Sequence, residues 1–446
     1  MEALRKTTLP LVATAAMGLG LIAGGGQAQA TVTCSKVAAV TGSDSAAGTE
    51  AAPFRSAQKL ADSLTTGQVG CLRSGTFDTQ NQVKVTRPGT TLTSFPGERA
   101  TVKGRLWVDA HDVTVVDLNI DGRNQTGLPS PSVTGSGNTF RGLDVTNHHT
   151  GICFSLGHPD WARAIDTVIV DSRIHDCGHL PATNFDHGIY VSAADGTIIR
   201  DNWIYDNADR GIQLYSDADD SRITRNVIDG NGSGIIFGGS PSWTSDGNVV
   251  KHNLITNSRI RDNVESSYGP QDLRGQDNVV RENCIDGGAY DDGDGGIGPQ
   301  VGFTAVDNLL VDPRYVDRGG KDFNLRPASP CASLMSDEPP VDDPPVDEPP
   351  VDDPPVGDPP VRITLEASDR RVPKGNQFTL AGVAPEATEV AIRRRTHGHW
   401  RTIRRRPVAS DGFDATVAGR PDGRQKYRAV ASGLVTSKRV VVKVRG

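Results

Sequence analysis

A histidine and an arginine stand at equivalent places in a repeated hexapeptide, and together they could remove a proton from carbon. Asp-His-Gly-Ile-Tyr-Val occupies residues 186–191, and Asp-Arg-Gly-Ile-Gln-Leu follows at residues 209–214. A neutral imidazole can act as a general base, and a guanidinium cation can neutralise a carboxylate beside the carbon that loses its proton. His187 and Arg210 therefore predict proton abstraction next to a carboxylate, provided that the fold places the two copies side by side.

A third copy of the hexapeptide, Gly-Ser-Gly-Ile-Ile-Phe at residues 232–237, keeps the same spacing. A fixed period of this length with the alternation of β-strands indicates a solenoid, in which each repeat stacks on its neighbour. Equivalent residues then lie one strand spacing apart, so we expect His187 about 4.8 Å from Arg210. The alternation of side chains along a strand places the fourth residue of each copy in the core, at Ile189, Ile212 and Ile235.

The outer surface of these coils gathers the candidate site. His187 and Arg210 each precede a glycine at a bend, and a charged group in a dry core is costly, so we expect both at the solvent-exposed edge of the sheet. Alignment of the preceding coil through Gly151 and Ile152 places His149 beside them. The candidate catalytic residues are His187 as base, Arg210 as the neutralising cation, and Tyr190 or Tyr215 as acid. The candidate substrate-binding residues are His149, Asp186, Asp209 and Gln213.

A second column supports the stacking. Segments with an Asn-x-Ile or Asn-x-Leu pattern align with an apolar residue three places before each member of the column. Stacked asparagines can hydrogen-bond along a ladder and satisfy a buried turn, so we expect a structural role. The column runs through Leu118, Leu143, Ser172, Asn202, Asn226, Asn253, Asn283 and Asn308.

The first thirty residues predict an export signal. Arg5 and Lys6 precede an apolar run at residues 9–23, and Ala28-Gln29-Ala30 forms a small-residue cleavage site. A membrane anchor is the alternative, but the run is short and is interrupted by glycines. No other segment is apolar enough to span a bilayer, so we expect a protein that is secreted or associated with the cell wall. We also expect it to be a monomer.

Six cysteines fit an oxidising compartment. Fifteen connectivities are open, and proximity along the chain favours one of them. None of the cysteines has the Cys-x-x-Cys spacing of a zinc or redox site. The favoured pairs are Cys34 with Cys71, Cys153 with Cys177, and Cys284 with Cys331.

The segments around the repeats resemble right-handed parallel β-helix proteins of the pectate-lyase-like superfamily. The resemblance rests on residues 44–54, 72–77, 95–102 and 113–121 and on the closing segments 311–315 and 323–330. It implies an all-β chain, with a helix at 52–64 that could cap the stack. The superfamily includes polysaccharide lyases, alginate epimerases and members without known activity, so the resemblance is specific for architecture and weak for chemistry.

The chain predicts four parts: a signal peptide at 1–30, a β-helix at 31–335, an acidic Pro-rich linker at 336–361 and a small antiparallel β-sandwich at 362–446. The linker repeats Asp-Asp-Pro-Pro-Val and close variants, which favour an extended spacer. The last part resembles bacterial immunoglobulin-like modules. From residue 363 onward it holds 18 Lys and Arg against 7 Asp and Glu, a difference of +11. It could bind an anionic cell-wall polymer, or its arginines could form a solvated face. We do not expect nucleic acid as a partner of an exported protein.

These features together predict action on an acidic polysaccharide. Abstraction of the C5 proton of a uronic acid leads to β-elimination or to epimerisation, and the residues do not distinguish the two outcomes. A glycoside hydrolase built on Asp186 and Asp209 is one alternative, and a non-catalytic polysaccharide-binding protein is another. The site requires no cofactor. Calcium could replace the arginine as the neutralising cation, bound at one of two acidic turns. The same acidic residues are equally typical of a turn that binds no metal. The two turns contain Asp217, Asp219 and Asp220, or Asp291, Asp292 and Asp294.

Overall fold

The computed structural model describes the chain in stretches that form two compact units, Met1–Pro344 and Pro345–Gly446. The predicted signal peptide and the predicted linker both lie outside the described residues. None of the helices within those residues is long and apolar enough to cross a membrane. The described stretches are residues 32–159, 161–335, 363–369, 371–385, 387–396, 399–409, 412–419, 423–431 and 440–445.

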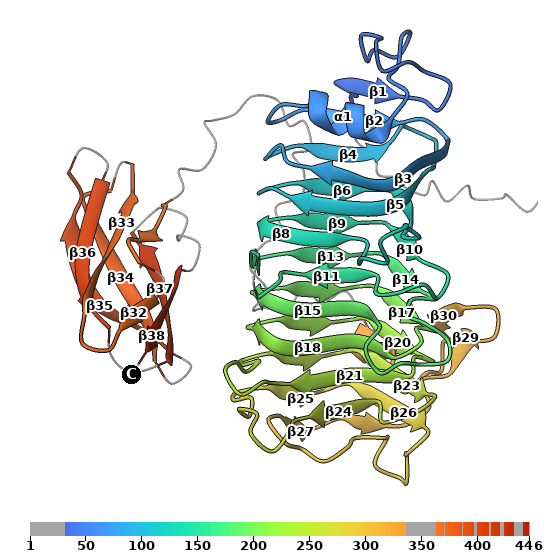
Figure 1. Cartoon of the computed structure of the whole chain (residues 1–446). Helices are drawn as coiled ribbons and strands as arrows, with labels where there is room; N and C mark the ends of the chain where they lie inside the picture. The colour runs from blue at the N-terminus through green and yellow to red at the C-terminus, as the bar shows by residue number, and fades with distance from the viewer. Residues whose placement is uncertain are drawn as a thin grey trace, which may run out of the picture. The chain divides into compact units, whose positions relative to one another are not determined.

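The first unit is a solenoid of parallel strands whose coils present three faces (Figure 1). Face A contains β1 (Lys36–Ala38), β2 (Val69–Leu72), β4 (Thr91–Ser94), β6 (Thr114–Val116), β9 (Thr139–Arg141), β13 (Val168–Val170), β16 (Ile198–Arg200), β19 (Arg222–Thr224), β22 (Val249–Lys251), β25 (Val279–Arg281) and β27 (Thr304–Val306). Face B contains β7 (Leu118–Asp121), β10 (Asp144–Thr146), β14 (Arg173–His175), β17 (Trp203–Tyr205), β20 (Val227–Asp229), β23 (Leu254–Ser258), β26 (Cys284–Gly288) and β28 (Leu309–Leu310).

Face C carries the longest strands of the coils. It contains β3 (Gly75–Val85), β5 (Ala100–Asp109), β8 (Ser132–Ser136), β11 (Phe154–Leu156), β12 (Ala164–Ile165), β15 (His187–Asp195), β18 (Arg210–Asp219), β21 (Ser233–Gly238) and β24 (Val264–Ser267). The long strand β5 pairs with both β7 and β8, so faces B and C belong to one continuous sheet.

The repeated hexapeptides stack in the predicted register. His187 pairs with Arg210, and Arg210 pairs with Ser233. The isoleucines of all three copies are fully buried in a core that runs along the solenoid. Each coil adds a few apolar side chains to this continuous core, which is how a chain with modest hydrophobic content stabilises a long stack.

Two local features flank the coils of the first unit. At the N-terminal end, α1 (Ala57–Ser63) lies within the predicted helical segment, and its N-cap Ser56 accepts a hydrogen bond from the Lys59 amide. After the last coil, β29 (Tyr315–Asp317), β30 (Asp322–Leu325) and the 3-10 helix Ala332–Met335 return along the side of the stack, where Phe323 of the hairpin packs on Trp203 and Tyr205 of face B. The three predicted disulfides are confirmed.

The asparagine column forms a buried ladder at the turn between faces A and B. Asn226 Oδ1 accepts hydrogen bonds from the backbone amide and the side chain of Asn202. Its Nδ2 donates to the carbonyl of Ile199 and to Oδ1 of Asn253. Further ladders, which the sequence reasoning missed, join Asn207 to Asn231 and Asn248 to Asn278.

Replacement of Asn226 by Ala should lower the free energy of unfolding by about 3 kcal/mol, because buried backbone groups on two coils lose their partners. The matched variant Asn308→Ala lies at the half-buried end of the same ladder, where the change should cost less. Denaturant unfolding of both variants measures the difference. Equal losses at the two positions would contradict a ladder whose buried centre carries the stability.

The second unit contains antiparallel sheets around an apolar core. In its described residues, β31 (Glu366–Ala367), β33 (Gln377–Val383) and β36 (Gly412–Ala418) form one sheet. The other sheet has the order β32 (Arg371–Pro373), β38 (Val440–Arg445), β37 (Gly423–Val430), β34 (Glu389–Thr396) and β35 (His399–Pro407). Side chains of both sheets share one core, which confirms the predicted fold class. Sequence reasoning missed β32, and the resemblance to immunoglobulin-like modules stays a prediction.

Candidate functional site

The outer surface of face C carries two rows of side chains. Strand pairing aligns one row from coil to coil, and it passes through Lys84, Trp107, Ser132, Ser155, Tyr190, Gln213, Ile236 and Glu265. Counting back three residues from this row gives a second row through His187, Arg210, Ser233 and Asp262. The two rows define the candidate site, on β15, β18, β21 and the segment that leads into β24 (Figure 1).

His187 and Arg210 point away from the core, as predicted, although both are buried. A Cβ atom at Gly188 would clash with the inward-pointing side chain of Asn207, so the neighbouring His187 lies on the outer side of the bend. Its ring makes an edge contact with Tyr190, with ring centroids 5.4 Å apart. The side chains of His187 and Arg210 are only 3% exposed. The predicted position at a solvent-exposed edge is therefore wrong.

The loop between β14 and β15, residues 178–186, accounts for this burial. Arg210 donates through Nη1 to the carbonyl oxygen of Asn184 and through Nη2 to its Oδ1, the latter at 2.6 Å. Asp209 Oδ2 accepts a hydrogen bond from the backbone amide of Asp186 at 2.9 Å. Asp209 and Arg210 of the next coil thus hold the loop over the His187–Arg210 pair.

Asp186 and Asp209, predicted to bind substrate, hold this loop in place. Asp186 Oδ2 accepts hydrogen bonds from His179 Nδ1 at 2.7 Å and from the Thr183 hydroxyl at 2.9 Å. Burial raises the pKa of Asp186, but these hydrogen bonds outweigh burial and leave the pKa below its ordinary value. A carboxylate that stays ionised is a poor proton donor, which argues against the hydrolase pair of Asp186 and Asp209.

Burial also governs the titration of the site. Burial, with the nearby Arg210 cation as a second cause, lowers the pKa of His187 to about 3. The imidazole is therefore neutral near pH 7. Burial lowers the pKa of Arg210, and Glu265 opposes this shift. Burial raises the pKa of Tyr190 above its usual range, so that phenol stays protonated.

Several polar atoms of this surface have no hydrogen-bond partner among the described protein atoms. Glu265, which is 8% exposed, contributes one of them, and the others come from coils on the same face. Buried polar atoms in folded proteins almost always have a partner, so these atoms require one from solvent or from a ligand. The atoms are His187 Nδ1, Arg210 Nε, Gln213 Oε1 and Glu265 Oε1.

His149 does not lie where the sequence alignment placed it. Phe154 pairs with Ile189, so the predicted alignment through Ile152 is wrong by two residues. His149 lies instead at a corner of the coil, where Nδ1 is 3.1 Å from the carbonyl oxygen of Gly178 and Nε2 is 3.5 Å from Asp176 Oδ1.

Sequence reasoning missed the carboxyl groups at the end of both rows. Residues 261–266 form a fourth copy of the repeat, in which Asn263 occupies the place of the glycine and hides the match. Burial, followed by the charge of Glu265 and of two further aspartates, raises the pKa of Asp262 to about 6. Asp262 is therefore partly protonated near neutral pH, next to the buried Glu265.

The acidic turns that could hold calcium have other partners. Asp291 accepts hydrogen bonds from the backbone amides of Gly287, Gly293 and Gly295. Asp217 forms an ion pair with Arg163. Within the described residues, no group of three or more His, Cys, Asp or Glu side chains is arranged to hold a metal ion. The turns therefore fit the simpler interpretation, in which the acids satisfy backbone groups.

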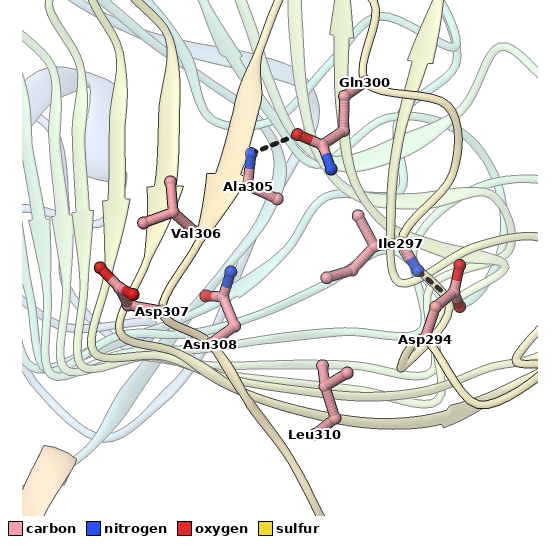
Figure 2. A pocket seen from close by; sticks show the side chains of 8 residues that line it. All are labelled: Asp294, Ile297, Gln300, Ala305, Val306, Asp307, Asn308 and Leu310. Atoms are coloured by element: carbon pink, nitrogen blue, oxygen red, sulfur yellow. Dashed lines mark hydrogen bonds between the residues drawn. The ribbon is translucent and has the colours of Figure 1, made fainter.

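A cavity of about 250 Å³ lies at the last coil, beside the end of these rows, because its lining residue Ile297 pairs with Val264. Figure 2 shows the backbone amide of Ala305 hydrogen-bonded to Gln300 and that of Ile297 to Asp294. Its polar groups thus cap backbone amides near the end of the stack, so we assign this cavity no chemistry. It is lined by Asp294, Ile297, Gln300, Ala305, Val306, Asp307, Asn308 and Leu310.

Comparisons with known proteins concern the solenoid. The family described as "Right handed beta helix region" matches residues 106–285. The pectate lyase Pel9A has a TM-score of 0.46 at 14% identity, over 67% of this chain and 91% of its own. XylC, solved with xylose, has a TM-score of 0.45 at 13% identity, over 56% of this chain and 66% of its own, so this chain spans just under two thirds of that protein. A rhamnogalacturonan lyase has a TM-score of 0.39 at 13% identity, over 62% and 86%. No curated protein matches the sequence.

The strand register and the matched family agree on the architecture. Parallel strands stack coil on coil through the matched residues and beyond them in both directions. The resemblance predicted from the sequence is confirmed at the level of the fold, which by itself carries no activity. The first unit of this chain is a right-handed parallel β-helix.

Proposed function

We propose that this protein acts on a uronic-acid-containing polysaccharide at the outer surface of face C by removing the proton at C5. The observation that carries the proposal is the set of buried polar atoms without protein partners on adjacent coils, at His187, Arg210 and Gln213. These atoms require partners, and a sugar with hydroxyl and carboxylate groups supplies them.

Arg210 would bind the carboxylate of the uronic acid. Its two Nη atoms already donate to two oxygens of Asn184, and a carboxylate offers the same pair of acceptors. The substrate would therefore displace Asn184 from Arg210, and the loop at residues 178–186 would move with it. The cation then stabilises the negative charge that develops when the C5 proton leaves.

His187 would take the C5 proton, since its imidazole is neutral and lies one strand from Arg210. In elimination, the C5–H electron pair forms the C4–C5 double bond, the C4–O4 bond breaks, and an acid protonates O4. In epimerisation, C5 takes a proton on the opposite face of the ring instead. Tyr190 or Tyr215 would donate the proton in either case.

The test is incubation of the full chain with pectate, alginate and glycosaminoglycans in deuterated water. We expect one of two products from at least one polymer. Deuterium at C5, detected by NMR, would identify epimerisation. Ultraviolet absorbance from an unsaturated product, which has no hydrogen at C5, would identify elimination. Binding with neither product would contradict the proposal and favour the non-catalytic alternative.

Glycoside hydrolysis is the second candidate, and Asp262 with Glu265 favours it. Hydrolysis of a glycosidic bond needs one carboxyl group that is protonated and a second that is ionised. Asp262 has a raised pKa and lies beside Glu265, so the two could take these roles. In that case new reducing ends would form without unsaturation or C5 exchange. Asp262→Asn would abolish their release, whereas His187→Gln would leave it intact.

The basic second unit would hold the enzyme on an anionic cell-wall polymer. Arg405 on β35 pairs with Glu389 at 2.7 Å, but both side chains are more than half exposed, so this ion pair contributes little to stability. This unit contains 18 basic and 7 acidic residues, and its net positive charge would attract a polyanion. Binding of this kind should weaken as salt concentration rises.

A further inference from the structure

The loop at residues 157–163 rises from the middle of a face C strand. The segments on either side of it, β11 and β12, both pair with β8 and with β15. Leu156 pairs with Val191 and Ala164 pairs with Ala194, so the chain leaves the strand and rejoins it. Both Leu156 and Ala164 are fully buried in the core, and the excursion between them therefore projects from the outer surface.

The base of this loop is held firmly. Gly157 has a φ of 70°, and a Cβ atom there would clash with the carbonyl oxygen of Ala193, so only glycine fits. The backbone amide of His158 donates to the carbonyl of Ala162 at 2.8 Å. Arg163 donates to the Asp217 carboxylate and, at 2.8 Å, to the carbonyl of Ala194. These contacts join the loop to β15 and β18, the strands of the candidate site.

Trp161 stands on this loop with most of its surface in solvent. Its side chain is 61% exposed, so the ring is open to contact with a ligand. One side of the indole stacks on the imidazole of His158, with centroids 4.1 Å apart and an angle of 18° between the planes. The stacking holds the ring in one orientation at little further cost in side-chain entropy when a ligand binds.

We propose that Trp161 is a stacking platform for a sugar ring of a polysaccharide that lies across face C. The apolar C–H face of a pyranose ring packs well on an aromatic side chain. The loop begins two residues after Ser155, the pairing partner of Tyr190, so the platform adjoins the rows of the candidate site. This inference rests on the proposed function only in that a carbohydrate polymer lies on face C. Trp161 would hold a ring of that polymer next to the ring at the catalytic position.

The test compares Trp161→Ala and Trp161→Phe with Tyr290→Ala in the full chain. Tyr290 is a matched control because it is 64% exposed and lies on a different loop, after β26. We expect Trp161→Ala to weaken binding of the long polymer about tenfold by calorimetry, with a smaller loss for Trp161→Phe and none for Tyr290→Ala. A monosaccharide that occupies only the catalytic position should bind all the variants alike.

Two outcomes separate this inference from the proposed function. Wild-type affinity in Trp161→Ala, with C5 exchange or elimination intact, would overturn the platform alone. Binding that depends on Trp161 in a protein that shows neither C5 exchange nor elimination would overturn the proposed reaction and leave the platform standing. Failure of the wild type to bind any polymer of the panel would overturn both. Because Trp161 is exposed, its replacement should leave the fold intact, which circular dichroism verifies.

Discussion

Arg210→Ala should reduce the rate of C5 proton removal by roughly 10³-fold, because the uronate carboxylate would keep its negative charge while a second charge develops at C5. NMR of deuterium at C5 measures this rate for epimerisation, and ultraviolet absorbance of the unsaturated product measures it for elimination. Loss of a buried cation in a site that excludes water has a larger effect than loss of a surface charge, since little solvent is present to take its place. Arg210 is buried and lies in register with His187, so the effect should fall on the rate of proton removal as well as on binding.

Two variants control for this effect. Arg210→Lys keeps the charge but loses the paired donors of the guanidinium, and it should retain part of the activity. Arg200→Ala removes an arginine from face A, where it pairs with Asp201 at 2.6 Å, and it should leave the rate unchanged. Full activity in a correctly folded Arg210→Ala protein would remove Arg210 from the mechanism.

His187→Gln should lower the rate of C5 proton removal by about 10²-fold to 10⁴-fold, the usual contribution of a positioned general base. Glutamine keeps a polar side chain of similar size but cannot accept a proton near neutral pH. His252→Gln is the matched control, because His252 follows β22 of face A, where its Nε2 lies 3.2 Å from Glu282, and the same change there should not affect catalysis. A His187→Gln enzyme with the wild-type rate would transfer the base to another residue of the rows.

The same variant should make the fold less sensitive to acid. The pKa of His187 in the folded protein is about 3, below the ordinary value of 6.5, so the unfolded chain binds the proton first as the pH falls. The preference of the folded protein for neutral His187 therefore contributes fully to the stability of the wild type above pH 6.5. This contribution is lost progressively as the pH falls toward pH 3. Between pH 7 and pH 4, His187→Gln should lose less stability than the wild type by on the order of 2 kcal/mol in denaturant unfolding. An identical pH dependence would show that His187 is not buried in its neutral form.

The sequence by itself determined the solenoid and the register of the three coils that carry the hexapeptides. The spacing between the hexapeptides and the alternation of isoleucines are local patterns. Neighbouring strands of a parallel stack lie at one fixed distance, so these patterns determine which residues lie side by side. The same logic predicted the pairing of His187 with Arg210, the asparagine ladder through Asn226 and the disulfide between Cys153 and Cys177 on neighbouring coils. Each of these features depends on which residues recur at which interval.

Only the tertiary structure decided what covers the site and how far it extends. The loop at residues 178–186 buries His187 and Arg210 through hydrogen bonds from the next coil, and spacing along the chain does not encode such contacts. Asn263 in place of glycine concealed the fourth copy and, with it, Glu265. The excursion that carries Trp161 interrupts a strand that nonetheless continues beyond it. Turns and loops vary in length without disturbing the core, because backbone pairing holds the strands on either side in register.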